Sequence, residues 1–437
     1  GGSDFAGCGD WQTPCATIAY GTSRAQESPP RARVLVSEGI YPENVILVSG
    51  ISVKGGYSAA TWRLDPDTNV TILSGTTPNP GSVKHKKAVV ANGITQTTEL
   101  SGCTIYGENN FYSAPGESGG NSYAVWVRNS SSALVITDNV IYGGRGSTGS
   151  TGTAGAQGSN GGNGAAGTDA YHTATKNCSG VTRAGGSAGS STCGTAGGAG
   201  ASSVCPVNNV QQANGSPGQG TGAGTGGDGG HDRYVSTTNC GLATSGGYSA
   251  EGLPGANGQN GSNGSAGSSC AVPAGSIVGD EWTGNLGTSG TAGTAGAGGG
   301  GGGAGGGVDV QGSGSCPSGD TLGSAGGGGG GGGCAGTAGQ TGMPGGASFG
   351  IFVTGSSGGT VPTITGNTVI RNAGGNGGAG GNGGNGGIGG QGASGGAIVG
   401  LGLTYQYAIG SGGFGGNGGW GGSGGGGGGG CGGGSYG

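Results

Sequence analysis

The stretch Gly146-Ser-Thr-Gly149-Ser-Thr-Gly152-Thr-Ala-Gly155 decides the fold, because glycine recurs in it at every third position and keeps this phase as far as Gly167. A strict period of three, with small residues between the glycines, predicts a left-handed extended helix of three residues per turn. One edge of such a helix has no side chains, so neighbouring segments can approach closely. The same period returns in four later segments, 252–267, 284–305, 374–395 and 412–430.

These segments are predicted to pack side by side in one bundle. Collagen needs abundant proline, whereas this chain has 15 Pro in 437 residues. Without proline, each peptide keeps its N–H and C=O groups, so neighbouring segments can form the lateral hydrogen bonds of polyglycine II. Disorder is the alternative for a glycine-rich, apolar-poor chain. Against disorder stand the constant phase, the low charge and the cysteines that border the runs.

The glycine-rich runs differ in how many side chains they carry. Residues 374–396 read mostly Gly-Gly-X, whereas 146–168 and 252–268 read mostly Gly-X-X. A segment surrounded by neighbours has less room for side chains, so we expect 374–396 and the all-glycine stretches 298–307 and 326–333 to lie inside the bundle.

Outside these runs the chain predicts strands without intervening helices. Short β-branched segments at 34–36, 44–48, 51–54 and 70–73 each end in Gly, Ser or Asn turns. Two later stretches, 124–141 and 350–370, resemble each other and place Asn139 and Asn367 at equivalent positions. This internal repeat predicts stacked coils of two or three strands with asparagine at the corners.

The N-terminal part resembles a known family. The phrase Gly39-Ile-Tyr-Pro-Glu-Asn-Val-Ile-Leu, followed by Gly50-Ile-Ser-Val-Lys-Gly-Gly-Tyr-Ser and Trp62, is similar to the opening coils of pectate-lyase-like surface proteins secreted by bacteria. The resemblance implies a right-handed parallel β-helix. The predicted fold class is therefore all-β, a right-handed parallel β-helix plus a Gly-rich polyglycine II bundle.

The predicted domains follow from this resemblance and from the repeat. Residues 1–142 form N-terminal β-helix coils, and 143–346 are a polyglycine II insertion that leaves one coil and returns to the next. Residues 347–373 continue the β-helix. Residues 374–437 rejoin the bundle and contain a short strand segment at 397–410.

Eleven cysteines indicate an oxidising compartment, and therefore a secreted, extracellular or bacterial cell-surface protein. Cys8 and Cys15 are the candidate disulfide. The odd count leaves one thiol over, and Cys103, in a strand-like segment, is the candidate buried free thiol. The alternative is that Cys431 is the odd one and links subunits covalently.

The sequence predicts no enzyme activity and no catalytic, cofactor-binding or metal-binding residue. Lyases of the β-helix fold use clustered Asp ligands for Ca²⁺ and a basic residue. Here Asp138 is alone, and Gly366 stands at its position in the other repeat. The three histidines, His85, His172 and His231, are far apart in sequence, so no Ser, His and Asp set is identifiable.

Nucleic acid and membrane partners are not expected. The net charge is −5, the one basic cluster at 84–87 is short, and no run of about 18 apolar residues predicts a transmembrane segment. The expected partner is the protein itself, as a homo-oligomer or fibre, with surface glycans or other cells as a second possibility.

Three functions remain. The first is a structural subunit that self-assembles into a fibre or surface coat. Its candidate contact residues are Tyr405, Tyr407, Phe414, Trp420 and Tyr436. An equal alternative is that these aromatic residues form a lid over the chain's own bundle. The second is an adhesin or receptor-binding module that uses the loops 171–183, 205–212 and 231–240. The third is ice binding, because the bundle resembles the glycine-rich antifreeze proteins of snow fleas and Thr148, Thr151 and Ala154 share one row.

Overall fold

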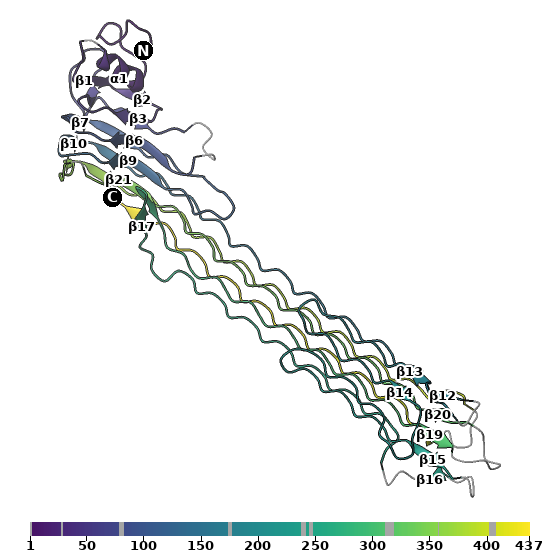
Figure 1. The fold of residues 1–437 in the computed structure, drawn as a ribbon. Helices are drawn as coiled ribbons and strands as arrows, with labels where there is room; N and C mark the ends of the chain where they lie inside the picture. The colour runs from purple at the N-terminus through teal and green to yellow at the C-terminus, as the bar shows by residue number, and fades with distance from the viewer. Residues whose placement is uncertain are drawn as a thin grey trace.

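The computed structural model shows an elongated all-β chain with strands gathered at one end and a long glycine-rich rod leaving them (Figure 1). It describes residues 2–27, 29–77, 83–173, 177–236, 242–243, 248–310, 319–356, 358–401 and 408–437.

Three five-stranded parallel sheets make up the strand end of the molecule, which we call the strand region. The first sheet contains β1 (Arg33–Ser37), β4 (Ser52–Tyr57), β7 (Thr98–Ser101), β10 (Leu134–Thr137) and β22 (Thr363–Thr365). The second contains β2 (Gly39–Tyr41), β5 (Thr71–Ser74), β8 (Cys103–Tyr106), β11 (Val140–Tyr142) and β23 (Thr368–Ile370). The third contains β3 (Val45–Leu47), β6 (Lys86–Asn92), β9 (Ser122–Arg128), β21 (Ser348–Thr354) and β24 (Ser435–Tyr436).

The chain visits the three sheets in turn, so the strand region consists of five stacked circuits. Residues at equivalent positions of successive circuits form rows, of which one contains Val34, Val53, Leu100, Ile136 and Ile364. The β-branched and leucine side chains of such rows meet inside and form the hydrophobic core. Asn139 and Asn367 also stack, with the amide nitrogen of Asn139 donating to Oδ1 of Asn367 over 3.0 Å.

The first circuit is covered by the helix α1 (Ile18–Gln26), which sequence analysis did not identify. Thr17 caps the helix by accepting a hydrogen bond from the Tyr20 N–H. The Glu43 carboxylate accepts from the N–H groups of Ile18 and Ala19, which ties the start of the helix to the first circuit. The Ile18 side chain is part of the core.

The connection between the second and third sheets lengthens over the first four circuits and is long again in the fifth. It comprises residues 42–44, 75–85, 107–121, 143–347 and 371–434 in the five circuits. The last two of these connections form the glycine-rich region. The glycine-rich region is therefore built from two successive circuits, each stretched at the same place.

A few short strands lie within the glycine-rich region. Most of them lie at its far end (Figure 1): β12 (Tyr171–His172), β13 (Thr182–Arg183), β14 (Ser203–Val204), β15 (Arg233–Val235), β16 (Leu242–Ala243), β19 (Val308–Val310) and β20 (Thr321–Leu322). The hairpin of β17 (Ser276–Val278) and β18 (Glu281–Thr283) lies back at the strand region, where Trp282 packs against Tyr123 and Phe349.

Backbone hydrogen bonds between segments hold the glycine-rich region together. The segment 323–346 is bonded to six others: 146–168, 185–191, 195–201, 287–305, 374–396 and 410–433. Gly330 shows the pattern, because its N–H donates to Gly416 over 2.9 Å while its carbonyl accepts from Gly299 over 2.9 Å. A Cβ on Gly329 would overlap the carbonyl oxygen of Gly299, so only glycine fits there.

The prediction of which segments lie inside was right in part. Residues 298–307 and 326–333 are buried throughout. The prediction for 374–396 was wrong, because every third residue from Asn376 to Ser394 is exposed. This segment bonds to three neighbours, 146–168, 323–346 and 410–433, so its third row faces outward. A Gly-Gly-X pattern therefore indicates a segment at a flat face, and an all-glycine stretch indicates the interior.

The register of the strands continues into the glycine-rich segments. Val140 pairs with Thr368, an offset of 228 residues, and Asn160 accepts from the Ile388 N–H at the same offset. Likewise Ser348 pairs with Ser435, and the Gly345 N–H donates to Cys431. The register of the stacked strands thus determines which glycine residues of neighbouring segments lie side by side.

Candidate functional site

The described residues bring no catalytic set together. His85 is half-buried directly before β6, and its Nδ1 accepts a hydrogen bond from the Asn121 N–H. Burial lowers the pKa of His85, against the Glu281 carboxylate, which raises it, and with the help of the Lys84 and Lys87 charges, so the neutral ring is favoured. His172 belongs to β12 at the far end of the rod. Asp138 lies at its corner beside Gly366 and accepts a hydrogen bond from the Thr137 hydroxyl.

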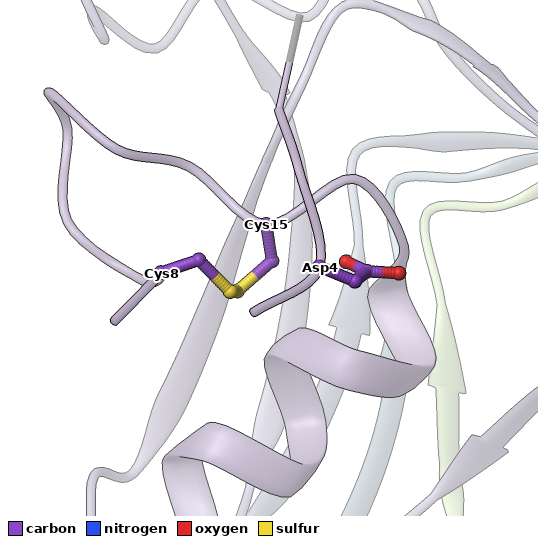
Figure 2. A group of neighbouring side chains, drawn as sticks. All are labelled: Asp4, Cys8 and Cys15. Carbon is purple, nitrogen blue, oxygen red and sulfur yellow. A yellow bond between two sulfur atoms is a disulfide. The ribbon is translucent and has the colours of Figure 1, made fainter. Parts of the chain in front are cut away.

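Two clusters have the residue types of metal sites, but both contain a disulfide. Asp4, Cys8 and Cys15 lie together before α1, and Figure 2 shows the two sulfur atoms bonded to each other. Asp4 accepts hydrogen bonds from the N–H groups of Ala16 and Thr17. Bonded sulfurs are not thiolates, which are the form that binds a metal. The second cluster, Asp320 with the Cys178–Cys205 disulfide, is unsuited to a metal for the same reason.

The cysteines are arranged mainly to tie the glycine-rich region. Besides Cys8–Cys15, the described residues form the disulfides Cys178–Cys205, Cys193–Cys334 and Cys270–Cys431. Cys431 is therefore not the odd cysteine, and the alternative that it links subunits was wrong. Among the described residues Cys103 is the free cysteine, and its burial raises the pKa of the thiol to about 12, which makes it unreactive.

The two ends of the core in the strand region differ, and this gives the first candidate interaction surface. At the helix-covered end, Val36 and Val45 are buried. At the other end, all three residues of β22 are exposed, and Ile364 is 38% exposed although its register partner Ile136 is fully buried. Val361 beside it is 64% exposed. We call this surface, residues 358–370, the open end.

The second candidate surface is a flat face of the glycine-rich region formed by segments 374–396, 410–433 and 251–268, with Asn160 and Asn163 at its border. Of the predicted self-association residues, Phe414 and Trp420 lie here and are 62% and 61% exposed. They do not form a lid over their own bundle. We call this surface the amide face, because asparagines follow it in rows.

Tyr436, another of the predicted self-association residues, lies elsewhere. Tyr436 stacks on Phe349 with ring centroids 4.8 Å apart and meets Trp282 edge-on, so it is an internal contact between the last strand and the hairpin. Tyr405 and Tyr407 lie outside the described residues.

The residues expected for ice binding and for adhesion are also placed. Thr148, Thr151 and Ala154 form one exposed row, whose first two members line a groove of about 790 Å³ with Phe111 and Tyr112. The three loops expected to carry adhesin contacts lie at the far end of the rod, as far as the structure describes them (Figure 1).

Sequence analysis missed Ile388 and the asparagine rows on the amide face. Asn257, Asn260 and Asn263 each accept, through Oδ1, the N–H of the residue 160 positions later, and Asn160 and Asn163 do so at 228 positions. The recurrence of Asn every third residue is the signal in the sequence, but its meaning depends on which segments are neighbours.

No protein-family model, curated protein or solved structure matches this chain. In the part of the chain that the structure describes, no helix has both the length and the apolar character needed to span a membrane.

Proposed function

We propose that this protein is a non-enzymatic extracellular structural protein whose copies self-assemble. In this proposal the three sheets form a right-handed parallel β-helix of the pectate-lyase-like kind, and the glycine-rich region is a polyglycine II bundle anchored on it. The cyclic order of strands supports the first part, and the period-three hydrogen bonding supports the second. The four disulfides among the described residues favour an oxidising, extracellular location.

The open end is the observation that carries the proposal. At the opposite end, α1 covers the core and Ile18 joins it. At the open end, no described element covers Ile364, and β22 and β23 are the last strands of their sheets. An uncovered apolar surface bordered by strand edges is a site where another chain can pack and pair.

A second copy of this chain is the occupant that fits the open end. Residues 358–370 contain no charged side chain, so two open ends can meet without repulsion between like charges. Contact of one open end with another buries the same apolar residues on both partners, as a two-fold symmetric interface requires. The result is a pair of strand regions joined end to end, each carrying its own rod.

Analytical ultracentrifugation across a dilution series, with electron microscopy of the same samples, tests this proposal. We expect the native protein to form end-to-end pairs or larger assemblies, and Val361→Glu with Ile364→Glu to be monomeric with unchanged disulfides. Ile388→Glu is the control, because it places a glutamate on an exposed isoleucine of the amide face and should leave assembly intact. Monomers of the native protein at every concentration would refute the proposal.

A further inference from the structure

The amide face carries a second site, at Trp420, that self-assembly through the open end does not use. Trp420 is 61% exposed and Ile388 is 54% exposed. They lie at the same level on adjacent segments, because the bonds from the Gly421 N–H to Gly387 and from the Gly418 N–H to Gly390 bracket them on both sides. Together they form an apolar platform on the amide face.

Two asparagines hold the platform from either side. Oδ1 of Asn260 accepts the Trp420 N–H over 2.8 Å, and Oδ1 of Asn160 accepts the Ile388 N–H over 2.9 Å. These bonds satisfy outward-facing backbone N–H groups that would otherwise be unpaired. They also engage the Oδ1 atom of each asparagine and fix the orientation of its amide group. Within the described part of the chain, the Nδ2 group of each asparagine has no protein partner and is free to donate.

The same arrangement repeats one turn along the face. Asn257 accepts from the Asn417 N–H over 2.7 Å, and Asn163 accepts from the Gln391 N–H over 2.8 Å. One turn further, Phe414 offers a second exposed ring. One turn of a helix with three residues per turn rises about 9 Å. The Trp420 ring, the amides of Asn257 and Asn163, and the Phe414 ring therefore follow one another at regular intervals along the face.

The part of the face around Trp420 and Phe414 is also uncharged. The stretches 154–166, 254–263, 382–394 and 414–423 contain no Asp, Glu, Lys, Arg or His. This composition excludes recognition by ion pairing, and so disfavours nucleic acids, anionic lipids and acidic polymers.

We propose that the amide face binds a neutral polysaccharide along its length. The apolar face of a sugar ring packs on Trp420 and Ile388, while its hydroxyl and ring oxygens accept from the Nδ2 groups of Asn160 and Asn260. Because the backbone already orients these amides, little side-chain entropy is lost on binding. A flat face suits an extended chain, whereas a single sugar would bury too little surface.

Co-sedimentation of the intact protein with microcrystalline cellulose and with chitin tests the proposal, with soluble polygalacturonate as an acidic comparison. The native protein should be retained on at least one of the two neutral polymers. Trp420→Ala should weaken this retention about tenfold. Phe111→Ala is the matched control, since Phe111 is a 72% exposed aromatic residue away from the face and should not affect retention.

Asn260→Asp separates recognition from folding. This variant keeps the oxygen that accepts the Trp420 N–H but removes the Nδ2 donor, so retention should fall severalfold while the melting temperature is kept. The proposal is overturned if neither neutral polymer retains the native protein, if Trp420→Ala is retained equally well, or if only polygalacturonate binds. It is also overturned if Trp420→Ala changes the sedimentation coefficient without changing retention, because the face then contacts a second copy.

Discussion

The strand region and the glycine-rich region share one register but are stabilised by opposite means. In the strand region, side chains such as Leu100 and Ile136 fill the space between sheets. In the glycine-rich region, segment 323–346 contacts its neighbours mainly through backbone carbonyl oxygens and N–H groups. The comparison shows that a chain can continue a stacked β architecture after its apolar residues end, provided that glycine lets the backbones approach.

Removing a long-range disulfide should have the largest effect on this comparison. Cys193 and Cys334 are 141 residues apart, so their bond restricts the unfolded chain strongly. Cys193→Ser with Cys334→Ser should lower the free energy of unfolding of the glycine-rich region by about 4 kcal/mol. Cys8→Ser with Cys15→Ser, which opens a separation of 7 residues, is the control and should cost about 2 kcal/mol. Calorimetry under non-reducing conditions measures both, and equal losses would contradict the chain-entropy explanation.

A cavity in the core of the strand region should have the second-largest effect on stability. Leu134 is fully buried in β10, so Leu134→Ala should destabilise by about 3 kcal/mol through lost burial and an unfilled space. Val135 points to the other side of the same strand, and Val135→Ala should cost less than about 1 kcal/mol. Urea unfolding followed by circular dichroism compares them. Similar losses at both positions would mean that side-chain packing does not stabilise this region.

The stability of the glycine-rich region should be lowered by adding side-chain atoms, whereas that of the strand region is lowered by removing them. Gly329→Ala places a Cβ against the Gly299 carbonyl and should cost about 2 kcal/mol or more. Gly426→Ala is the matched control in the same region, because its Cβ would lie 3.5 Å from the nearest atom, the oxygen of Gly381. We expect that variant to change stability by less than about 0.5 kcal/mol. If the two variants melt alike, close backbone packing is not what stabilises the rod.

The smallest effect should come from the asparagine rows. Asn257→Ala removes the acceptor of the Asn417 N–H at an exposed position, where water replaces part of the lost bond. We expect a loss of about 0.5 to 1 kcal/mol, and Asn257→Asp, which keeps the acceptor oxygen, should lose less. Thermal melts at moderate salt distinguish the two. A loss above about 2 kcal/mol for Asn257→Ala would show that these amides support the rod more than the glycine contacts do.

Local patterns in the sequence were enough to predict the strands and the period-three segments, because both depend on residues close in the chain. The parallel arrangement was predicted from the repeat of 124–141 and 350–370 and from the family resemblance. The predicted strand segments at 34–36, 51–54 and 70–73 correspond to β1, β4 and β5. Helix α1 was missed, although Thr17 is an acceptable cap, because the helix is short and its stripe of Ile18, Thr22 and Ala25 is weakly apolar.

What depends on neighbours could not be predicted from the sequence alone. The position of 374–396 was predicted wrongly, because a Gly-Gly-X pattern is compatible with both a surface and an interior segment. The number of neighbouring segments decides between the two. The pairing of Cys270 with Cys431, 161 residues away, follows from the register of two segments and not from cysteine spacing. The site at Trp420 likewise exists only because 374–396 and 251–268 lie on either side of it.

Hydrogen exchange of the backbone amides, followed by mass spectrometry, tests most directly whether backbone hydrogen bonds order the glycine-rich region. We predict that the amides of 298–305 and 326–333 exchange as slowly as those of β7 and β10, because both sets are buried and bonded. Fast exchange of the glycine stretches, together with protected strands, would show a disordered region attached to a folded one and would contradict the account.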